Sequence, residues 1–265
     1  MTRPDWIAIE YSTERLLQWD MRSDDVLATR QLAPMPLTDL AEQLPQDLPV
    51  YISGARGAGH PVPCTPPPPQ RSGAFHLLPG VTQSAPRDSM ESEVTRIAGF
   101  LALNPNFDGT LCLPGATSRW VQISAGEIVS FRSVMTGTLL ALLQTPEALG
   151  PLESAPDPDV LRDAVDRAMG RPAALTADLA SLRADILAGD AGGAGSRALG
   201  WLIGVELAAT KPWWLGQNIA LLSDGPGADA YRIALEAQGV PVLIADGPRM
   251  ALEGLKRARA PRSKA

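Results

Sequence analysis

The stretch Trp6-Ile-Ala-Ile-Glu-Tyr-Ser-Thr-Glu-Arg-Leu-Leu-Gln-Trp19 decides the fold of this chain. Its two apolar runs, at 6–9 and 16–19, are separated by polar residues, which predicts two strands joined by a turn. The same order of strand, turn and hairpin returns at Thr110-Leu-Cys-Leu-Pro-Gly-Ala-Thr-Ser118, followed by apolar runs at 120–123 and 128–131. The repeated order indicates an α/β protein with two similar lobes and a boundary near 108–113.

Outward from these two stretches, apolar periodicity predicts the remaining elements. We expect further strands at 26–32, 48–53, 218–223 and 240–244, and helices at 37–44, 88–103, 135–143, 159–169, 173–187, 198–210, 228–238 and 249–259. Thr38 is the expected N-cap of the first helix. Six prolines between Pro61 and Pro69 exclude a helix or a central strand there. The second half is mainly helical, and its last helix is a candidate to cross back to the first lobe.

Composition and charge exclude several classes of protein. With 265 residues, 45% of them hydrophobic and 20% charged, the chain is globular rather than disordered. The net charge of −6 argues against a nucleic-acid partner. Two cysteines, Cys64 and Cys112, cannot form a disulfide scaffold or a four-cysteine metal site. No run approaches the ~20 apolar residues of a membrane span, and the N-terminus lacks a signal peptide, so we expect a cytoplasmic protein without a membrane partner.

Three turns follow predicted buried strands, at 10–14, 114–118 and 223–227, and are rich in small or hydroxyl residues. Backbone amides in such turns can bind phosphate oxygens, although strands also end this way for structural reasons alone. Neither a GxxxxGK[ST] loop nor a helix-opening GxGxxG motif is present. Phosphoryl transfer also needs carboxylates and cations. The candidate carboxylates are Glu10, Glu93, Asp224 and Asp246, and the candidate cations are Arg56, Arg119 and Arg132.

Four motifs carry a resemblance to a known family, and they occur in the same order and at the same spacing. Leu113-Pro-Gly-Ala-Thr-Ser-Arg-Trp-Val121 resembles PGTHSKWV, and Ser130-Phe-Arg-Ser-Val-Met-Thr-Gly-Thr-Leu139 resembles FRTxMTGEL. Gly200-Trp-Leu-Ile-Gly-Val-Glu206 resembles GLLIGAE, and Ile7-Ala-Ile-Glu-Tyr-Ser-Thr-Glu-Arg-Leu16 stands where the family has IAIDWGSTNLR. On these motifs the chain resembles the 2-dehydro-3-deoxygalactonokinase (2-keto-3-deoxy-galactonate kinase) family, in the superfamily that includes hexokinase and actin.

The resemblance implies both a fold and an activity. The fold is two ribonuclease-H-like lobes of the actin-like ATPase type around a cleft, an N-terminal lobe of residues 1–110 and a C-terminal lobe of residues 111–265. The activity is ATP-dependent phosphorylation of 2-dehydro-3-deoxy-D-galactonate to its 6-phosphate, in galactonate catabolism, with Mg²⁺ as the metal. The partner is therefore a small sugar acid, and a homodimer is the candidate assembly.

The matching motif positions also imply roles for individual residues. Those assigned to ATP are Glu10, Ser12 and Thr13 in the first phosphate loop, Gly115, Ala116 and Thr117 in the second, and Asp224 and Gly225 in the adenosine loop. Glu10 is also the expected Mg²⁺ ligand. Those assigned to the sugar acid are Gly54, Arg56, Arg119, Trp120, Arg132, Thr136 and Gly137. Glu93 is the candidate catalytic base.

Several motif positions differ from the family pattern. Ser12 replaces a glycine and Glu14 adds a negative charge at the first phosphate loop, which predicts weak nucleotide binding. Thr138 replaces the glutamate of MTGE. In the segment that corresponds to RGEETQ, Glu91 replaces the arginine and Arg96 the glutamine. The alternative to a kinase is therefore a catalytically impaired relative that binds a sugar acid or regulates another protein.

Overall fold

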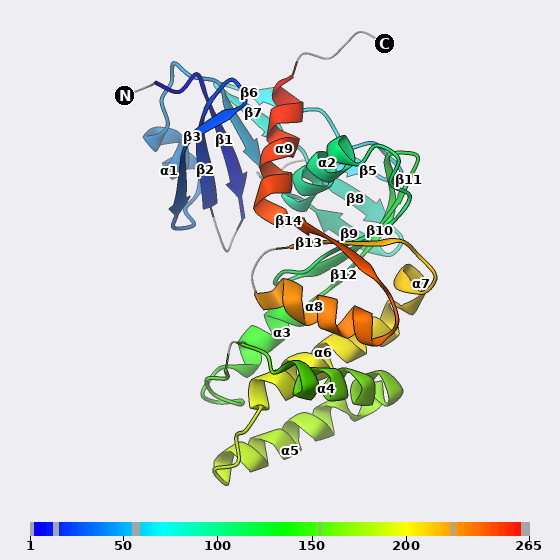
Figure 1. Cartoon of the computed structure of the whole chain (residues 1–265). Coiled ribbons are helices and arrows are strands. Elements are labelled where there is room, and N and C mark those ends of the chain that lie inside the picture. The colour runs from blue at the N-terminus through cyan, green and yellow to red at the C-terminus, as the bar shows by residue number, and fades with distance from the viewer. Residues whose placement is uncertain (1–2, 13–15, 55–58, 154, 224–225, 261–265) are drawn as a thin grey trace. The chain divides into compact units, whose positions relative to one another are not determined.

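The structure is a computed structural model, and it describes residues 3–12, 16–54, 59–153, 155–223 and 226–260. Contacts within the chain divide it into two compact units. The first comprises Met1–Asp108, Ile123–Ser130 and Asp246–Ala265, and the second comprises Gly109–Gln122 and Phe131–Ala245. Both units combine sheets with helices (Figure 1), so the predicted α/β class is confirmed.

A six-stranded sheet forms the frame of the first unit, in the order β3-β2-β1-β4-β7-β6. Its strands are β1 (Trp6–Tyr11), β2 (Leu16–Arg22), β3 (Asp25–Leu32), β4 (Val50–Ser53), β6 (Gln70–Ser72) and β7 (Phe75–Leu78). Strand β1 pairs antiparallel with β2 and parallel with β4. A smaller sheet holds β5 (His60–Pro61), β8 (Val81–Ser84) and β9 (Arg87–Met90).

Strand β1 is apolar from Trp6 to Ile9 because helices cover both faces of its sheet. Side chains alternate along a strand, so Ile7 and Ile9 pack toward α1 (Leu37–Gln43) while Trp6 and Ala8 pack toward α9 (Gly247–Arg259). Figure 1 shows α9 beside α2 (Glu93–Leu103). These two helices approach so closely that a Cβ on Gly99 would lie 1.9 Å from the carbonyl oxygen of Met250.

The second unit is built on a five-stranded sheet in the order β12-β11-β10-β13-β14. These strands are β10 (Gly109–Leu113), β11 (Ser118–Ser124), β12 (Glu127–Val134), β13 (Ile219–Ser223) and β14 (Val242–Asp246). The helices are α3 (Thr136–Leu143), α4 (Pro158–Gly170), α5 (Leu175–Leu187), α6 (Ala194–Ala209), α7 (Lys211–Trp214) and α8 (Pro226–Ala237), with a 3₁₀ turn at Pro172–Ala174.

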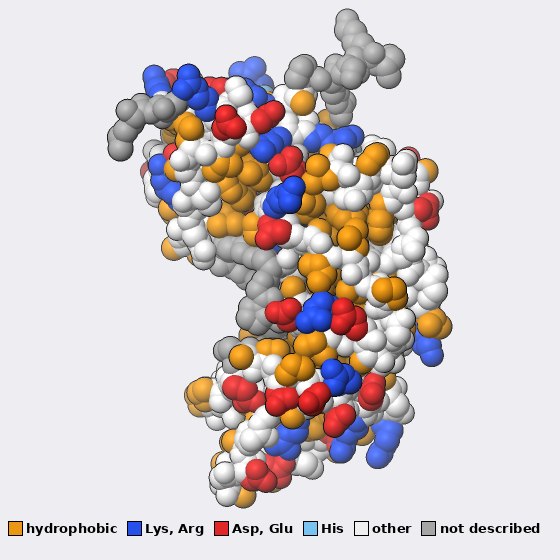
Figure 2. All heavy atoms as spheres, viewed as in Figure 1, with side chains coloured by type: hydrophobic (Ala, Val, Ile, Leu, Met, Phe, Trp, Pro, Cys, Tyr) orange, Lys and Arg blue, Asp and Glu red, His pale blue; other side chains and the backbone are white. Residues whose placement is uncertain are grey.

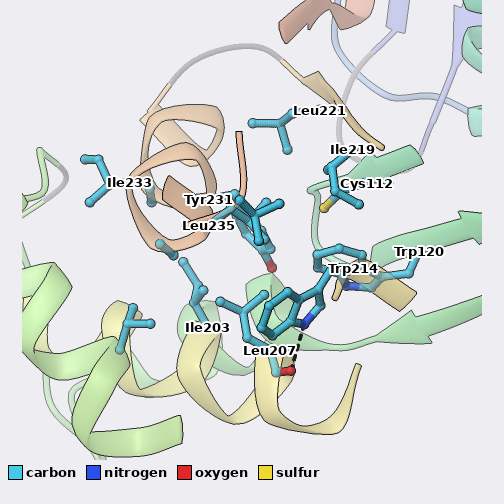
Figure 3. Close-up of a cluster of buried hydrophobic side chains, with 14 of the residues drawn as sticks. Cys112, Trp120, Ile203, Leu207, Trp214, Ile219, Leu221, Tyr231, Ile233 and Leu235 are labelled. Carbon is cyan, nitrogen blue, oxygen red and sulfur yellow. Dashed lines mark hydrogen bonds between the residues drawn. The ribbon is translucent and has the colours of Figure 1, made fainter. Parts of the chain in front are cut away.

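The core of the second unit lies between this sheet and helices α4, α6 and α8 (Figure 3). Trp120, Trp214 and Tyr231 are its large aromatic members, and the Trp214 indole N–H donates to the carbonyl of Leu207 at 2.9 Å. Helix α6 reaches α4 closely because Gly200 and Gly204 lack side chains at the crossing. A Cβ on Gly204 would lie 2.5 Å from the backbone oxygen of Val165.

Some local predictions were wrong. Thr38 does not cap α1, because Pro36 occupies the N-cap position and the Thr38 hydroxyl donates to Asp39 instead. The helix predicted at 88–103 begins only at Glu93, because Arg87–Met90 pairs with β8 as a strand. The short strands between 60 and 84 and the single-turn helix α7 were missed.

We predict that Gly254→Ala weakens the packing of α9 on α2. Its Cβ would lie 2.1 Å from the carbonyl oxygen of Thr95, so one of the two helices must shift, and overpacking of this kind costs about 1–3 kcal/mol. Denaturant unfolding measures the change. Gly170→Ala is the control, because nothing lies within 4 Å of its Cβ position. Equal effects of the two substitutions would contradict the close packing.

Candidate functional site

Three predicted residues of the first unit, Glu10, Gly54 and Glu93, come together at the carboxyl end of β1. Strands β1 and β4 are parallel, and Glu10 lies opposite Ser53. Both strands therefore end at the same edge of the sheet. Gly54 has φ +77°, and a Cβ there would lie 1.9 Å from the carbonyl oxygen of Tyr11 and 2.9 Å from Cβ of Ser92. Only glycine fits between the end of β1 and the start of α2.

The Glu10 carboxylate is buried and forms an ion pair with Arg96 of α2, at 2.6 Å between Oε1 and Nε. Arg96 lies one helical turn after Glu93, which is the first residue of α2. The Oε2 atom of Glu93 accepts a hydrogen bond from the backbone N–H of Glu91 at 3.2 Å. The carboxyl edge of the sheet therefore carries a buried ion pair and a half-buried carboxylate.

The expected Mg²⁺ role of Glu10 stays a prediction, and the arrangement limits it at one of the two carboxylate oxygens. A guanidinium already occupies the side of Oε1, and Mg²⁺ at that oxygen would bring two positive groups together. Within the described ranges, no group of three or more His, Cys, Asp or Glu side chains is arranged to hold a metal ion. Mg²⁺ in phosphoryl-transfer enzymes is held largely by phosphates and water, so this part of the chain need not supply a cage for it.

The loop of the second unit follows strand β10 and lies against the first turn of α3. Gly115 is exposed, and a Cβ on Gly137 of α3 would lie 2.3 Å from the carbonyl oxygen of Gly115. The backbone N–H of Thr138 donates to the Ala116 carbonyl at 2.8 Å, and its hydroxyl donates to the same oxygen at 3.1 Å. The loop and the N-terminus of α3 therefore form one hydrogen-bonded unit.

A buried carboxylate lies beneath this loop. Glu206 of α6 is 1% exposed, and it accepts hydrogen bonds from the Trp120 indole at 2.7 Å, the Tyr231 hydroxyl at 2.6 Å and the Thr136 hydroxyl. The Ser118 and Tyr231 hydroxyls are 2.6 Å apart. Figure 3 shows Tyr231 and Trp120 in the cluster that also contains Cys112.

Burial raises the pKa of Glu206 above its usual value, against the opposing effect of the hydroxyl and indole donors. The pKa of Tyr231 is raised well above its usual value, first by burial and then by the charge of Glu206. Burial and the same charge also raise the pKa of Cys112 well above its usual value, which keeps the thiol protonated and unreactive.

The remaining predicted residues divide into four groups. Trp120 and Thr136, expected at the sugar acid, are buried, and their polar atoms face Glu206. Arg119 donates to the Ser133 hydroxyl, and Arg132 is exposed on β12. Ser12 directly follows β1, and Ala116 and Thr117 are half-buried in the loop after β10. Thr13, Glu14, Arg56, Asp224 and Gly225 lie outside the described residues.

Sequence reasoning missed Glu206 and Arg96 as members of the site. The signal for Glu206 was one acidic residue in an otherwise apolar helical stretch, since buried carboxylates are rare unless they have partners. Arg96 gave no such signal, because an arginine on an amphipathic helix is ordinarily solvated.

On the face of the molecule drawn in Figure 2, side chains of one charge do not gather into a single patch. Acidic and basic side chains lie interspersed over α4, α5 and α8 (Figure 2), and several form ion pairs, such as Arg232 with Glu236 at 2.9 Å. None of the helices in the described part of the chain is both long and apolar enough to cross a membrane.

Comparison with known proteins agrees with this architecture. The model of the 2-keto-3-deoxy-galactonokinase family matches residues 26–258. The probable 2-dehydro-3-deoxygalactonokinase of Rhizobium meliloti (strain 1021) is 31% identical over 194 residues, which cover 69% of this chain and 63% of the relative. The 2-dehydro-3-deoxygalactonokinase of Escherichia coli (strain K12) is 29% identical over 189 residues, covering 68% and 63%. The matched part thus spans about 63% of the length of these curated relatives.

Solved structures extend the similarity over nearly the whole chain. The crystal structure of a candidate 2-dehydro-3-deoxygalactonokinase from Sinorhizobium meliloti has a TM-score of 0.81 and 26% identity, covering 96% of this chain and 97% of its own. The activator of the 2-hydroxyisocaproyl-CoA dehydratase from Clostridium difficile, with bound ADPNP, has a TM-score of 0.54 and 10% identity, covering 96% and 93%. The predicted two-lobed α/β fold of the actin-like ATPase type is confirmed.

We predict that Arg96→Gln destabilises the protein by about 3 kcal/mol, because it leaves the buried Glu10 carboxylate without its guanidinium. Glu10→Gln combined with Arg96→Gln is expected to cost less than the sum of the two single substitutions. Denaturant unfolding of all four proteins measures the coupling. Arg232→Gln, which removes exposed ion pairs, is the control and should change stability by less than about 0.5 kcal/mol. If the changes in the free energy of unfolding from the two single substitutions simply added up in the double variant, the ion pair would be contradicted.

We also predict a pH-dependent effect of Glu206→Gln. Because the pKa of Glu206 is raised in the folded state, its protonation stabilises the fold below the unfolded pKa, and this contribution is lost as the pH rises through the folded pKa. The glutamine variant has no such group. The stability of the unmodified protein relative to the variant should therefore fall as the pH rises above 4.5, the ordinary pKa of a glutamate. Denaturant unfolding at a series of pH values upward from there checks the sign, and a constant or rising difference would contradict it.

Proposed function

This chain belongs to the 2-keto-3-deoxy-galactonokinase family, and from that premise we propose that it transfers the γ-phosphoryl group of ATP to the 6-hydroxyl of 2-dehydro-3-deoxy-D-galactonate. The curated relatives carry the name of this activity, which supports both the reaction and the substrate class. Membership of a kinase family favours phosphoryl transfer over a protein that only binds the sugar acid.

The observation that carries the proposal is the open backbone of the loop after β10. A Cβ at Gly115 would meet only the carbonyl oxygen of Thr117, at 3.5 Å, so the space above the glycine is free for a ligand. The N-terminus of α3 lies directly beside it, and helix N-termini favour anions. This geometry suits a phosphate group that must approach the main chain closely.

In the proposed reaction, the 6-hydroxyl oxygen attacks the γ-phosphorus of ATP. A bond forms from that oxygen to phosphorus, the bond from phosphorus to the bridging oxygen breaks, and ADP leaves with the bonding electron pair. The hydroxyl proton passes to a base, for which Glu93 at the start of α2 is our candidate. ATP enters as its Mg²⁺ complex, and the Oε1 atom of Glu10 is paired with Arg96.

Two arginines are the candidates for the carboxylate of the sugar acid. Arg132 is exposed on β12, and Arg119 lies on the neighbouring strand β11. A guanidinium can bind a carboxylate through two parallel hydrogen bonds, which fixes the orientation of the substrate as well as its position. We therefore retain both arginines as sugar-acid ligands in this proposal.

We predict that the purified protein converts ATP to ADP only when 2-dehydro-3-deoxy-D-galactonate is present, at about 1–100 turnovers per second. A coupled ADP assay measures the rate, and ³¹P NMR identifies the phosphate monoester. Gly115→Ala should lower kcat/KM at least about tenfold, because its Cβ meets only the Thr117 carbonyl oxygen, at 3.5 Å, and takes up space that the phosphate needs above the loop. Gly170→Ala is the matched control. Nucleotide or sugar-acid binding without turnover would contradict the kinase proposal.

A further inference from the structure

Glu206 connects the two sides of the loop formed by residues 114–118. On one side, Tyr231 donates to Glu206 and is hydrogen-bonded to Ser118, the residue at which the loop enters β11. On the other side, the Thr136 hydroxyl donates to the same carboxylate oxygen, Oε2. Thr136 is the first residue of α3, whose Thr138 donates twice to the Ala116 carbonyl. Tyr231 and Thr136, which we call the two anchors of the loop, therefore donate to the same atom, Oε2 of Glu206.

Burial of a carboxylate at this position has a cost, which its hydrogen bonds must offset. Glu206 lies among apolar side chains such as Ile203 and Leu207, and its burial disfavours the charged form. Replacing a buried ion pair as a whole with apolar residues of similar volume is often neutral or stabilising, whereas removing one member of a hydrogen-bonded group leaves its partners unsatisfied. A leucine at 206 would fill the core without the cost of desolvation, but it would leave Trp120, Thr136 and Tyr231 without their shared acceptor.

We propose that Glu206 is a positioning residue that holds the loop 114–118 and the first turn of α3 in one fixed geometry. The role rests on the proposed function, because a fixed loop serves transfer by presenting the backbone around Gly115 to the phosphate in a single conformation. Preorganised donors need no rearrangement during the reaction, so their effect appears in kcat. Glu206 itself touches neither substrate.

The network makes a graded prediction for two substitutions. In Glu206→Gln, the amide oxygen can still accept from Trp120, and the amide nitrogen can donate to the hydroxyl oxygens of Thr136 and Tyr231. In Glu206→Leu, every one of these interactions is lost. The loop should therefore be slightly looser in the glutamine variant and much looser in the leucine variant.

Amide hydrogen exchange in the free protein tests the positioning role independently of activity. We expect exchange of the Thr138 and Leu139 amides, which donate to the Ala116 and Met135 carbonyls, to be at least about tenfold faster in Glu206→Leu, the scale of one lost hydrogen bond, and intermediate in Glu206→Gln. Thr210→Val is the matched control, because it removes a buried hydroxyl that donates to the backbone oxygen of Glu206 but does not contact the loop. Its exchange at these two amides should match that of the unmodified protein.

Steady-state kinetics supply the second readout. We expect kcat to fall at least about tenfold in Glu206→Leu, with partial rescue in Glu206→Gln, while the KM for the sugar acid changes less than about twofold. Equal loss of kcat in Thr210→Val and Glu206→Leu would overturn the inference, since it would indicate general core damage.

The two proposals fail in distinguishable ways. Absence of turnover in the unmodified protein overturns the proposed kinase function, whereas unchanged exchange of the Thr138 and Leu139 amides in Glu206→Leu overturns the positioning role whether or not the protein is active. If the leucine variant does not fold, Tyr231→Phe and Thr136→Val each remove one anchor, and faster exchange of these amides is expected in both. Unchanged exchange in both would overturn the inference.

Discussion

The enclosed carboxylate of Glu206 is the constraint on which the second unit depends. An acceptor with no water nearby must be satisfied by protein donors, and its donors come from β11, α3 and α8. Helix α8 is far from β11 and α3 in the sequence, and the shared acceptor fixes the positions of all three elements together. A hydrophobic core alone would tolerate small shifts between them, because apolar contacts are not directional. The hydrogen-bonded carboxylate makes the loop above it geometrically unique.

The first unit also contains a buried carboxylate, and there an ion pair and a glycine fix the local structure. The charge of Glu10 is balanced by Arg96 at 2.6 Å, and Gly54 lets the chain leaving β4 pass against the end of β1. Both units thus place a buried acidic side chain close to the strand end from which a candidate loop begins. The difference is the partner: a guanidinium neutralises Glu10, whereas neutral donors surround Glu206 and leave its charge to be opposed only by dipoles.

The sequence predicted the elements whose apolar pattern is unambiguous, and it failed where tertiary pairing decides. Strand β1 and the hairpin of β11 and β12 were found because their apolar runs are bounded by turns. The predicted helix at 88–103 included most of strand β9, since the polar residues of that strand follow no period of two and only pairing with β8 fixes it. The ligand role of Trp120 stays a prediction. Motif spacing gives its place in the chain, but the direction of its indole depends on Glu206, 86 residues later.

The motif positions that differ from the family pattern acquire a physical explanation in the structure. Thr138 stands where the motif has a glutamate, and both its hydroxyl and its N–H bind the Ala116 carbonyl, so it ties α3 to the loop without adding negative charge beside a phosphate. Arg96 stands where the motif has a glutamine, while Glu91 replaces the motif's arginine. The segment therefore still carries one guanidinium, and it is the one that balances Glu10. Substituted motif residues that form mutually compensating contacts preserve the fold around the site, because a buried charge left unpaired would cost stability whether or not the site is active.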